Sequence, residues 1–203
     1  MAGDSTTAQP STDGRSKQRA KAAATRHRLL DAAADVVRTD GVSGLTLERV
    51  AEVAGVSKGG LLYHFASKRD LVVGLLSRTL TEADDTLHSL SAASDRPSGT
   101  FARAYLDYVT SGQHGEADAA AGIFAAAALE DGDLTPAQDQ FARWQDRLLT
   151  EDGIDPTVAL LARVVGDGLW LIDLFGLAPP SPAQRQRLAE LVIDLIEDPQ
   201  HSS

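Results

Sequence analysis

The stretch LTLERVAEVAGVSKGGLLYHFASKRDL, residues 45–71, decides the fold. Thr46 stands where the N-cap of a helix belongs, and the short apolar face after it stops at Gly55. Ser57 offers a second N-cap, and another short helical segment follows it. The order of cap, short helix, glycine turn, cap and short helix predicts a helix-turn-helix whose second helix is presented to a partner.

Longer helices are expected on both sides of this unit. Apolar residues recur at steps of three and four over residues 22–39, which is the stripe of an amphipathic helix that ends at Gly41. Ser67 and Asp70 form a capping box that begins another long helix. No segment alternates with the period of two that a half-buried strand needs, so the sequence predicts an all-α fold.

The second short helix should have an inner and an outer face. Leu61 and Phe65 form an i, i+4 apolar pair, and we expect both in the core. The residues that would then point away from the core are Lys58, Gly59, Leu62 and Tyr63. Leu62 could touch a thymine methyl group in a major groove, and Lys58 could reach a guanine edge or a phosphate. The alternative is that Leu62 belongs to the core.

Two further features of this region favour a partner. The adjacent Gly59 and Gly60 each cost about 1 kcal/mol relative to alanine in a helix interior, and close approach of the backbone to a partner would explain them. Lys68 and Arg69 oppose the dipole of the following helix, and a phosphate bound there would resolve the conflict. Neutral donors to phosphate on either flank would be Tyr63 and His64, although each alone can be an ordinary surface residue.

Charge is unevenly distributed along the chain, whose formal net charge is −10. Residues 1–80 hold 12 Lys or Arg against 8 Asp or Glu, a balance of +4, which leaves −14 for the rest. Residues 15–28 carry six basic residues and no acidic one. This run is a candidate nucleic-acid arm, or alternatively a solvated leader. The polar composition of residues 1–20 predicts that they lack fixed structure.

The 203 residues include no cysteine, which excludes a disulfide framework, a thiolate metal site and a cysteine nucleophile. The longest apolar run, residues 119–129, is too short to span a bilayer, and the start shows no signal peptide. We therefore expect a cytoplasmic protein with no membrane partner.

The second half of the chain contains three helix starts in which a cap precedes proline. These starts are Thr135-Pro136, Asp155-Pro156 and Ser181-Pro182. Further helices are expected over residues 101–111 and 116–130. Residues 158–175 are apolar nearly all round, which predicts a helix buried in the core or at a subunit interface, and the last helix carries one apolar stripe. Two such helices suit a bundle shared between two protomers.

A small-molecule pocket is the hypothesis for this second half, built on its aromatic residues and one acid in an apolar helix. The candidate ligand-binding residues are Phe101, Tyr105, Tyr108, Phe124, Trp144, Asp167 and Trp170. The alternative is that the aromatic residues are simply core. Asp167 could also pair with Arg163, which lies four residues before it.

Signals for catalysis or metal binding are weak. Residues 55–59 match the G-x-S-x-G pattern of a hydrolase nucleophile, but no strand pattern precedes Ser57. The five histidines have no ligand spacing, and the acidic clusters near Glu130 and Glu151 lack calcium-loop spacing and are interpreted as caps and turns. We expect no catalytic residue, no metal site and no cofactor.

Residues 22–75, and above all TLERVAEVAGVSKGGLLYHFASKRDL, resemble the DNA-binding region of the tetracycline-repressor (TetR/AcrR) family of bacterial regulators. Gly59, Phe65 and Lys68 match the family's pattern, whereas Leu62 and Gly60 depart from its more frequent tyrosine and threonine. The resemblance implies a homodimeric, all-helical repressor whose third helix enters the major groove. It also implies a larger C-terminal domain that binds a small ligand and dimerises through the final two helices.

These inferences predict a leader (residues 1–20), a helix-turn-helix domain (21–67) and a ligand-binding and dimerisation domain (68–203). The candidate DNA-binding residues are Thr46, Ser57, Lys58, Gly59, Gly60, Leu62, Tyr63, His64 and Lys68. The expected function is a repressor that binds a palindromic double-stranded operator as a homodimer and is released by a small-molecule effector. The alternatives are a small-molecule-binding helical enzyme, which would need convergent titratable groups, and a structural adaptor that binds no DNA.

Overall fold

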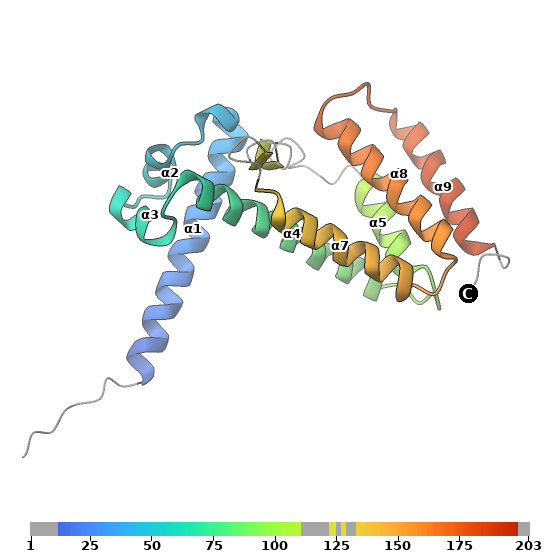
Figure 1. Cartoon of the computed structure of the whole chain (residues 1–203), viewed down its shortest axis with the longest axis horizontal. Coiled ribbons are helices and arrows are strands. Elements are labelled where there is room, and N and C mark those ends of the chain that lie inside the picture. Colours follow the sequence, from blue (N-terminus) through green and yellow to red (C-terminus); the bar gives the residue numbers. More distant parts are fainter. Residues whose placement is uncertain (1–11, 111–121, 125–126, 129–132, 199–203) are drawn as a thin grey trace, which may run out of the picture.

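The computed structural model describes residues 12–110, 122–124, 127–128 and 133–198, and every element in these ranges is a helix (Figure 1). The all-α prediction is confirmed. The buried apolar residues form one continuous core that runs through both halves of the chain.

The first helix, α1 (Thr12–Gly44), is longer than expected. The prediction that residues 1–20 lack fixed structure is wrong for residues 12–20, which are helical. Those residues are rich in Arg, Lys, Gln and Ala, which are strong helix formers, and they extend a helix whose later turns are anchored by the buried Leu29 and Leu30. The predicted stop at Gly41 is present as a kink, because its φ of 71° is not helical.

The next three helices are α2 (Leu47–Val53), α3 (Lys58–His64) and α4 (Lys68–Ala92). Their predicted N-caps are confirmed, since the side chain of each cap accepts a hydrogen bond from a backbone N–H of the first turn. The caps are Thr46, Ser57 and Ser67. Gly55 makes the turn between α2 and α3 with a φ of 64°, which glycine adopts without strain. We call α2, α3 and the C-terminal part of α1 the head.

The second half contains α5 (Thr100–Thr110), α7 (Thr135–Thr150), α8 (Pro156–Leu174) and α9 (Pro182–Glu197). Helix α5 packs against both α4 and α8, and α4 continues from the head into this half (Figure 1). The predicted helix over residues 101–111 is therefore found as α5. Most of the helix predicted over residues 116–130 lies outside the described residues.

The predicted helix starts are correct at two of three prolines. Asp155 caps α8, and Ser181 begins α9 with a capping box. Thr135 is not a cap, because α7 begins one residue earlier than predicted, with Leu134 as an N-cap that makes no side-chain hydrogen bond. In the acidic cluster near Glu151, Asp152 caps another helix: its carboxylate accepts from the N–H groups of the first turn of α5, at 2.8 and 2.9 Å.

Within the protomer α8 is buried on one face only, and burial of its other face at a subunit interface stays a prediction. Ala159, Ala162 and Leu169 are buried against the rest of the chain, whereas Val164 is 60% exposed and Phe175, just after the helix, is 62% exposed. Helix α9 is divided in the same way, with Val192 and Ile196 inside and Leu188, Leu191 and Leu195 outside. None of the helices that the structure describes has the length and apolarity needed to cross a membrane.

Candidate nucleic-acid interface and ligand pocket

Helix α3 presents one face to solvent because its other face is held in the core. Leu61 and Phe65 are almost completely buried, as the i, i+4 pair predicts. On the opposite face Tyr63 is 81% exposed and Leu62 is 39% exposed, so the alternative that Leu62 belongs to the core is wrong. His64 is half-buried at the end of the helix, with its ring edge-on to that of Tyr63.

The two glycines of α3 differ in their surroundings. A Cβ atom built on Gly60 would lie 3.3 Å from the Oγ atom of Ser57, so the cap itself keeps this position small. A Cβ atom on Gly59 would meet nothing within 4 Å. Nothing in the described chain therefore requires a glycine at position 59, and the cost of that glycine to the helix has no internal compensation.

Lys58 is tied to the helix before it. Its Nζ atom lies 2.5 Å from the Oε1 atom of Glu48, and both side chains are more than half exposed. The hydrogen bond from Lys58 lowers the pKa of the Glu48 carboxyl. The sequence analysis missed Glu48, because the two residues are ten positions apart and only the angle between α2 and α3 brings them together.

The unfavourable positive charge at the start of α4 is partly balanced by an acidic residue of the same chain. The Arg69 guanidinium lies 3.1 Å from a carboxylate oxygen of Asp133, which precedes α7, and this pairing lowers the pKa of Asp133. Arg69 thus has an internal partner, and the phosphate expected at this helix start stays a prediction. Lys68 is half-buried in the same turn, close to the Ser67 cap.

An aromatic cavity lies between α4, α5, α7 and α8, with the segment 122–124 also contributing. Five of the predicted ligand-binding residues line it: Tyr105, Tyr108, Phe124, Trp144 and Trp170. The sequence analysis missed Leu80 and Phe141, which line it too. The cavity has a volume of about 60 Å³, which holds a few water molecules at most.

Two of the predicted ligand-binding residues do not line this cavity. Phe101 is buried elsewhere, with the Arg147 guanidinium 4.3 Å from the centre of its ring. Asp167 accepts a hydrogen bond from the Tyr105 hydroxyl and pairs with Arg163 at 3.2 Å, which confirms the predicted i, i+4 pair. Burial, followed by the charge of Asp167, raises the pKa of the Tyr105 phenol, so this group stays protonated and donates to the carboxylate.

Polar anchoring of the cavity wall comes from α4. The Asp84 carboxylate accepts hydrogen bonds from the Trp144 indole at 2.6 Å and from the Gln140 amide at 3.0 Å. Phe124 packs edge-on against Trp170, with ring centres 4.8 Å apart. Two residues before Phe124, a Cβ atom on Gly122 would lie 2.6 Å from Val37 of α1. The cavity wall and the head are therefore in direct contact.

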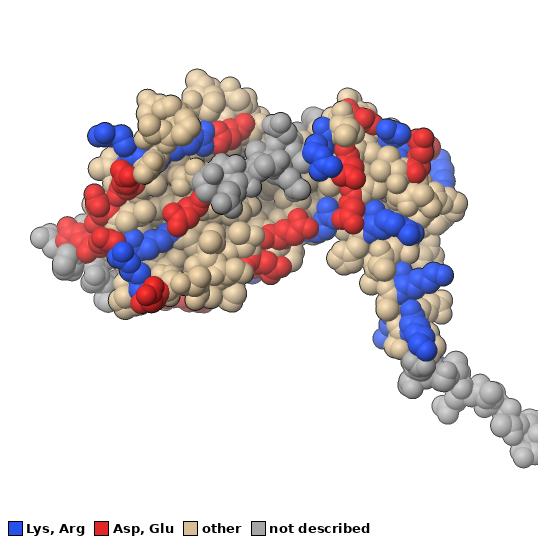
Figure 2. Space-filling view, turned by 180° about the vertical axis from the view of Figure 1, so that it is seen from behind, with Lys and Arg blue, Asp and Glu red and all other residues tan. Residues whose placement is uncertain are grey.

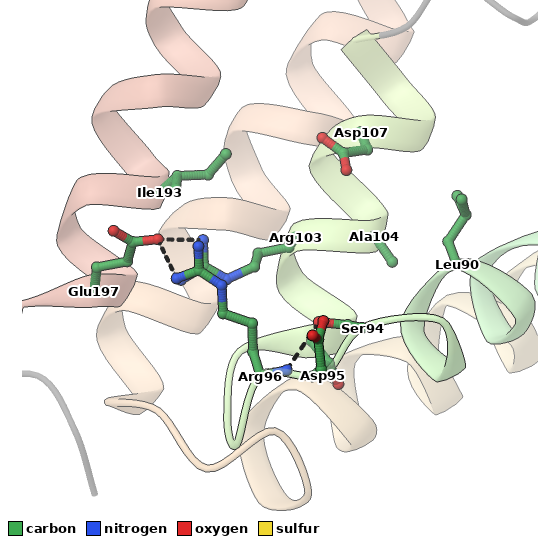
Figure 3. Close-up of a pocket in the computed structure, with 10 residues that line it drawn as sticks. Leu90, Ser94, Asp95, Arg96, Arg103, Ala104, Asp107, Ile193 and Glu197 are labelled. Atoms are coloured by element: carbon green, nitrogen blue, oxygen red, sulfur yellow. Dashed lines mark hydrogen bonds and ion pairs between the residues drawn. The ribbon is translucent and has the colours of Figure 1, made fainter.

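A second, polar pocket of about 360 Å³ lies between α5, α9 and the α4–α5 connection (Figure 3). Glu197, the last residue of α9, pairs with Arg96 at 2.5 Å and with Arg103 at 3.1 Å. Burial raises the pKa of the nearby Asp107 carboxyl. The Glu197 carboxylate thereby ties the end of α9 to α5, which is a structural role.

Neither a metal-ligand cluster nor a strand-borne nucleophile is present in the described part of the chain. It contains no group of three His, Asp or Glu residues placed to hold a metal ion. Ser57, the serine of the G-x-S-x-G match, is the N-cap of α3 and follows no strand, so the nucleophile interpretation has no structural basis here.

Comparison with known proteins gives two family models that together match most of the chain. Residues 29–75 match "Bacterial regulatory proteins, tetR family", and residues 99–197 match "Tetracyclin repressor-like, C-terminal domain". Among curated relatives, the transcriptional regulator SrpR of Pseudomonas putida is 39% identical over 61 residues, 30% of this chain and 29% of SrpR. The matched part is thus less than a third of that relative's length.

Solved structures align over nearly their whole length. A TetR-family member from Streptomyces coelicolor A3 has a TM-score of 0.67 at 28% identity, covering 85% of this chain and 98% of that one. The multidrug binding protein EbrR in complex with ethidium has a TM-score of 0.65 at 27% identity, with the same coverage. The two family models and these structures agree with the helix-turn-helix and helical second half described above, and the chain belongs to the tetR family of bacterial regulatory proteins.

Proposed function

We propose that this protein is a ligand-responsive transcription regulator, most simply a repressor, that binds a palindromic DNA operator as a homodimer. The observation that carries the proposal is the outward face of α3, where an exposed Tyr63 and Leu62 stand beside Gly59, a glycine that no contact among the described residues requires. A helix of this kind, held by a capped turn, is suited to lie in a major groove. The protein would act in the cytoplasm, where its DNA is, and would catalyse no reaction.

The proposed DNA contacts follow from the position of each side chain. Leu62 and Tyr63 would face base edges, Lys58 would reach a guanine edge or a phosphate, and the uncovered backbone at Gly59 would allow close approach. The residues proposed to support or flank these contacts, through caps, backbone N–H groups or phosphates, are Thr46, Ser57, Gly60, His64 and Lys68.

Selection from a random-sequence duplex library tests this function. We expect the full chain to enrich a palindrome with half-sites about 34 to 36 Å apart. Tyr63→Ala and Lys58→Ala should change which palindrome is preferred, whereas Lys68→Ala should weaken binding to all sequences and lower the salt slope by about one unit. Failure to enrich a palindrome would leave the helical adaptor or enzyme as the better interpretation.

The proposed effector site is the aromatic cavity. Its lining is apolar and aromatic, and the second half of the chain is strongly acidic, which favours a neutral or cationic planar ligand. At about 60 Å³ the cavity is far smaller than the roughly 300 Å³ of an occupied ligand site, so a ligand would have to displace the wall. Because Phe124 belongs to the segment that touches α1, and Leu80 belongs to α4, this displacement would move the head.

Ethidium is a suitable probe, because EbrR, a similar structure, is described in complex with it. We expect ethidium to raise the thermal midpoint of the full chain, and Trp170→Ala to abolish the shift. Phe101→Ala serves as the control, because Phe101 is a buried aromatic residue outside the cavity lining. Equal loss of the shift in both variants would argue against this cavity as the site.

A further inference from the structure

We propose that the N-terminal part of α1 is a second DNA-binding element, which binds backbone phosphates beside the bases that α3 reads. This inference rests on the proposed function and concerns residues 14–21, GRSKQRAK, which we call the basic arm. The arm holds four basic residues and no acidic residue in a chain whose net charge is −10.

The basic arm protrudes from the rest of the molecule. Residues 14–21 are all exposed, and the first buried residues of α1 are Leu29 and Leu30. In Figure 1 this part of α1 extends past the head and away from α5, α8 and α9, and Figure 2 shows Lys and Arg side chains along it. Arg15 and Arg19 belong to this exposed segment, several turns before the first buried residue of α1, so their charge can reach a polyanion.

The helical register places two of these arginines on the side of the α3–α4 turn. Arg15 and Arg19 precede Arg26 by 11 and 7 residues, which is close to three and two helical turns. The Arg26 guanidinium lies 4.9 Å from the centre of the Phe65 ring, directly after α3. Arg15 and Arg19 therefore continue the face of α1 that abuts the end of the recognition helix.

The opposite face of the basic arm carries an equal charge. Lys17 and Lys21 precede Arg28 by the same 11 and 7 residues, so they form a separate stripe about half a turn away. Duplex DNA lying against α3 would meet the arginine stripe first. The two stripes thus offer a comparison in which the formal net charge changes equally but is lost from different sides of the helix.

The experiment compares full-length Arg15→Ala/Arg19→Ala with Lys17→Ala/Lys21→Ala. Binding to the selected palindrome, with about 10 further base pairs on each side, is measured at several salt concentrations. The arginine variant should lower the salt slope by about 1.8, which is 0.9 for each lost phosphate contact, and the lysine variant by well under half of that. Circular dichroism should show unchanged helix content, because alanine is the better helix former.

Equal effects of the two variants, or no effect of either, would overturn the proposal. If the arginine variant binds like the wild type while Lys58→Ala does not, the proposal that the basic arm binds DNA is wrong and the proposed function is retained. The same comparison is made on a random-sequence duplex. A shallower slope there for the arginine variant alone supports the basic arm even if no palindrome is ever enriched and the proposed function fails.

Discussion

Lys58 forms an ion pair with Glu48 in the structure without DNA. The Glu48 carboxylate lies 2.5 Å from the Lys58 ammonium, and both groups are exposed. Because the pKa of Glu48 is lowered, the carboxylate is ionised at neutral pH, and acidification breaks the pair only below the ordinary range of a glutamate. A DNA phosphate must therefore compete with Glu48 for this lysine.

Glu48→Gln should raise the affinity for duplex DNA and steepen its salt dependence by about 0.9, because Lys58 can then bind a phosphate. Glu52→Gln is the matched control, since Glu52 lies one turn further along α2 and pairs with Arg49 at 3.1 Å instead. Fluorescence anisotropy at several salt concentrations measures the DNA affinity of both variants and its salt dependence. Equal gains in the two variants would show only a general effect of charge, and a loss of affinity in Glu48→Gln would mean that the pair positions Lys58 for binding.

At the scale of an element, α8 uses its two central glycines differently. A Cβ atom on Gly166 would lie 2.5 Å from the Tyr105 ring, whereas one on Gly168 would meet nothing within 4 Å. Gly166 is thus the point where α8 and α5 approach closely. Gly168 belongs to the face of α8 that carries the exposed Val164 and Leu171.

Gly166→Ala should lower the free energy of unfolding by about 1 to 3 kcal/mol, because the added methyl group overpacks the core. Gly168→Ala should not lower the stability of the protomer, because the methyl group has space and alanine favours the helix by about 1 kcal/mol. Urea unfolding followed by circular dichroism distinguishes the two. Similar losses in both variants would contradict the close approach at Gly166.

The contact between the segment 122–124 and α1 joins the cavity wall to the head. Gly122→Ala would place a methyl group against Val37, and we expect it to cost about 1 to 3 kcal/mol. Val37→Ala alone should also destabilise the protein, by leaving a cavity. The double variant should cost less than the sum by at least about 0.5 kcal/mol in a double-mutant cycle. Strict additivity would mean that the two residues do not share this contact.

For the whole molecule, the outer faces of α8 and α9 form an apolar surface that the described part of the chain leaves uncovered. Val164, Leu171, Leu191 and Leu195 are exposed on it. A helix pair of this kind is typical of a bundle shared by two protomers, which is the proposed homodimer. Two heads at a fixed separation would then match two half-sites of an operator.

Leu191→Glu should convert the protein to a monomer, because it places a charge in the centre of this surface. Leu90→Glu is the control, since Leu90 is an exposed leucine of α4 outside both helices. Light scattering after size exclusion should give a monomer mass for the first variant only. A dimer that survives Leu191→Glu would place the protomer contact elsewhere.

Local sequence determined the helices and most of their boundaries. The caps at Thr46, Ser57 and Ser67 act within three residues of themselves, so their outcome does not depend on the rest of the fold. The same holds for the inner face of α3, where a spacing of four residues places Leu61 and Phe65 together. The basic arm shows that polar composition alone is a poor predictor of disorder. Its polarity predicted a lack of structure, but it is helical, because its residues favour a helix and because the following turns of α1 are buried.

Only the tertiary structure decided which distant residues meet. Phe101 and Trp144 are both buried aromatics, yet only Trp144 lines the cavity, because the cavity lies beside Tyr105 and Tyr108, one and two turns further along α5 than Phe101. The pairs Lys58–Glu48 and Arg69–Asp133 likewise depend on how helices cross. Periodicity specifies a face of a helix but not the neighbour of that face, because the neighbour is selected by the packing of the whole core.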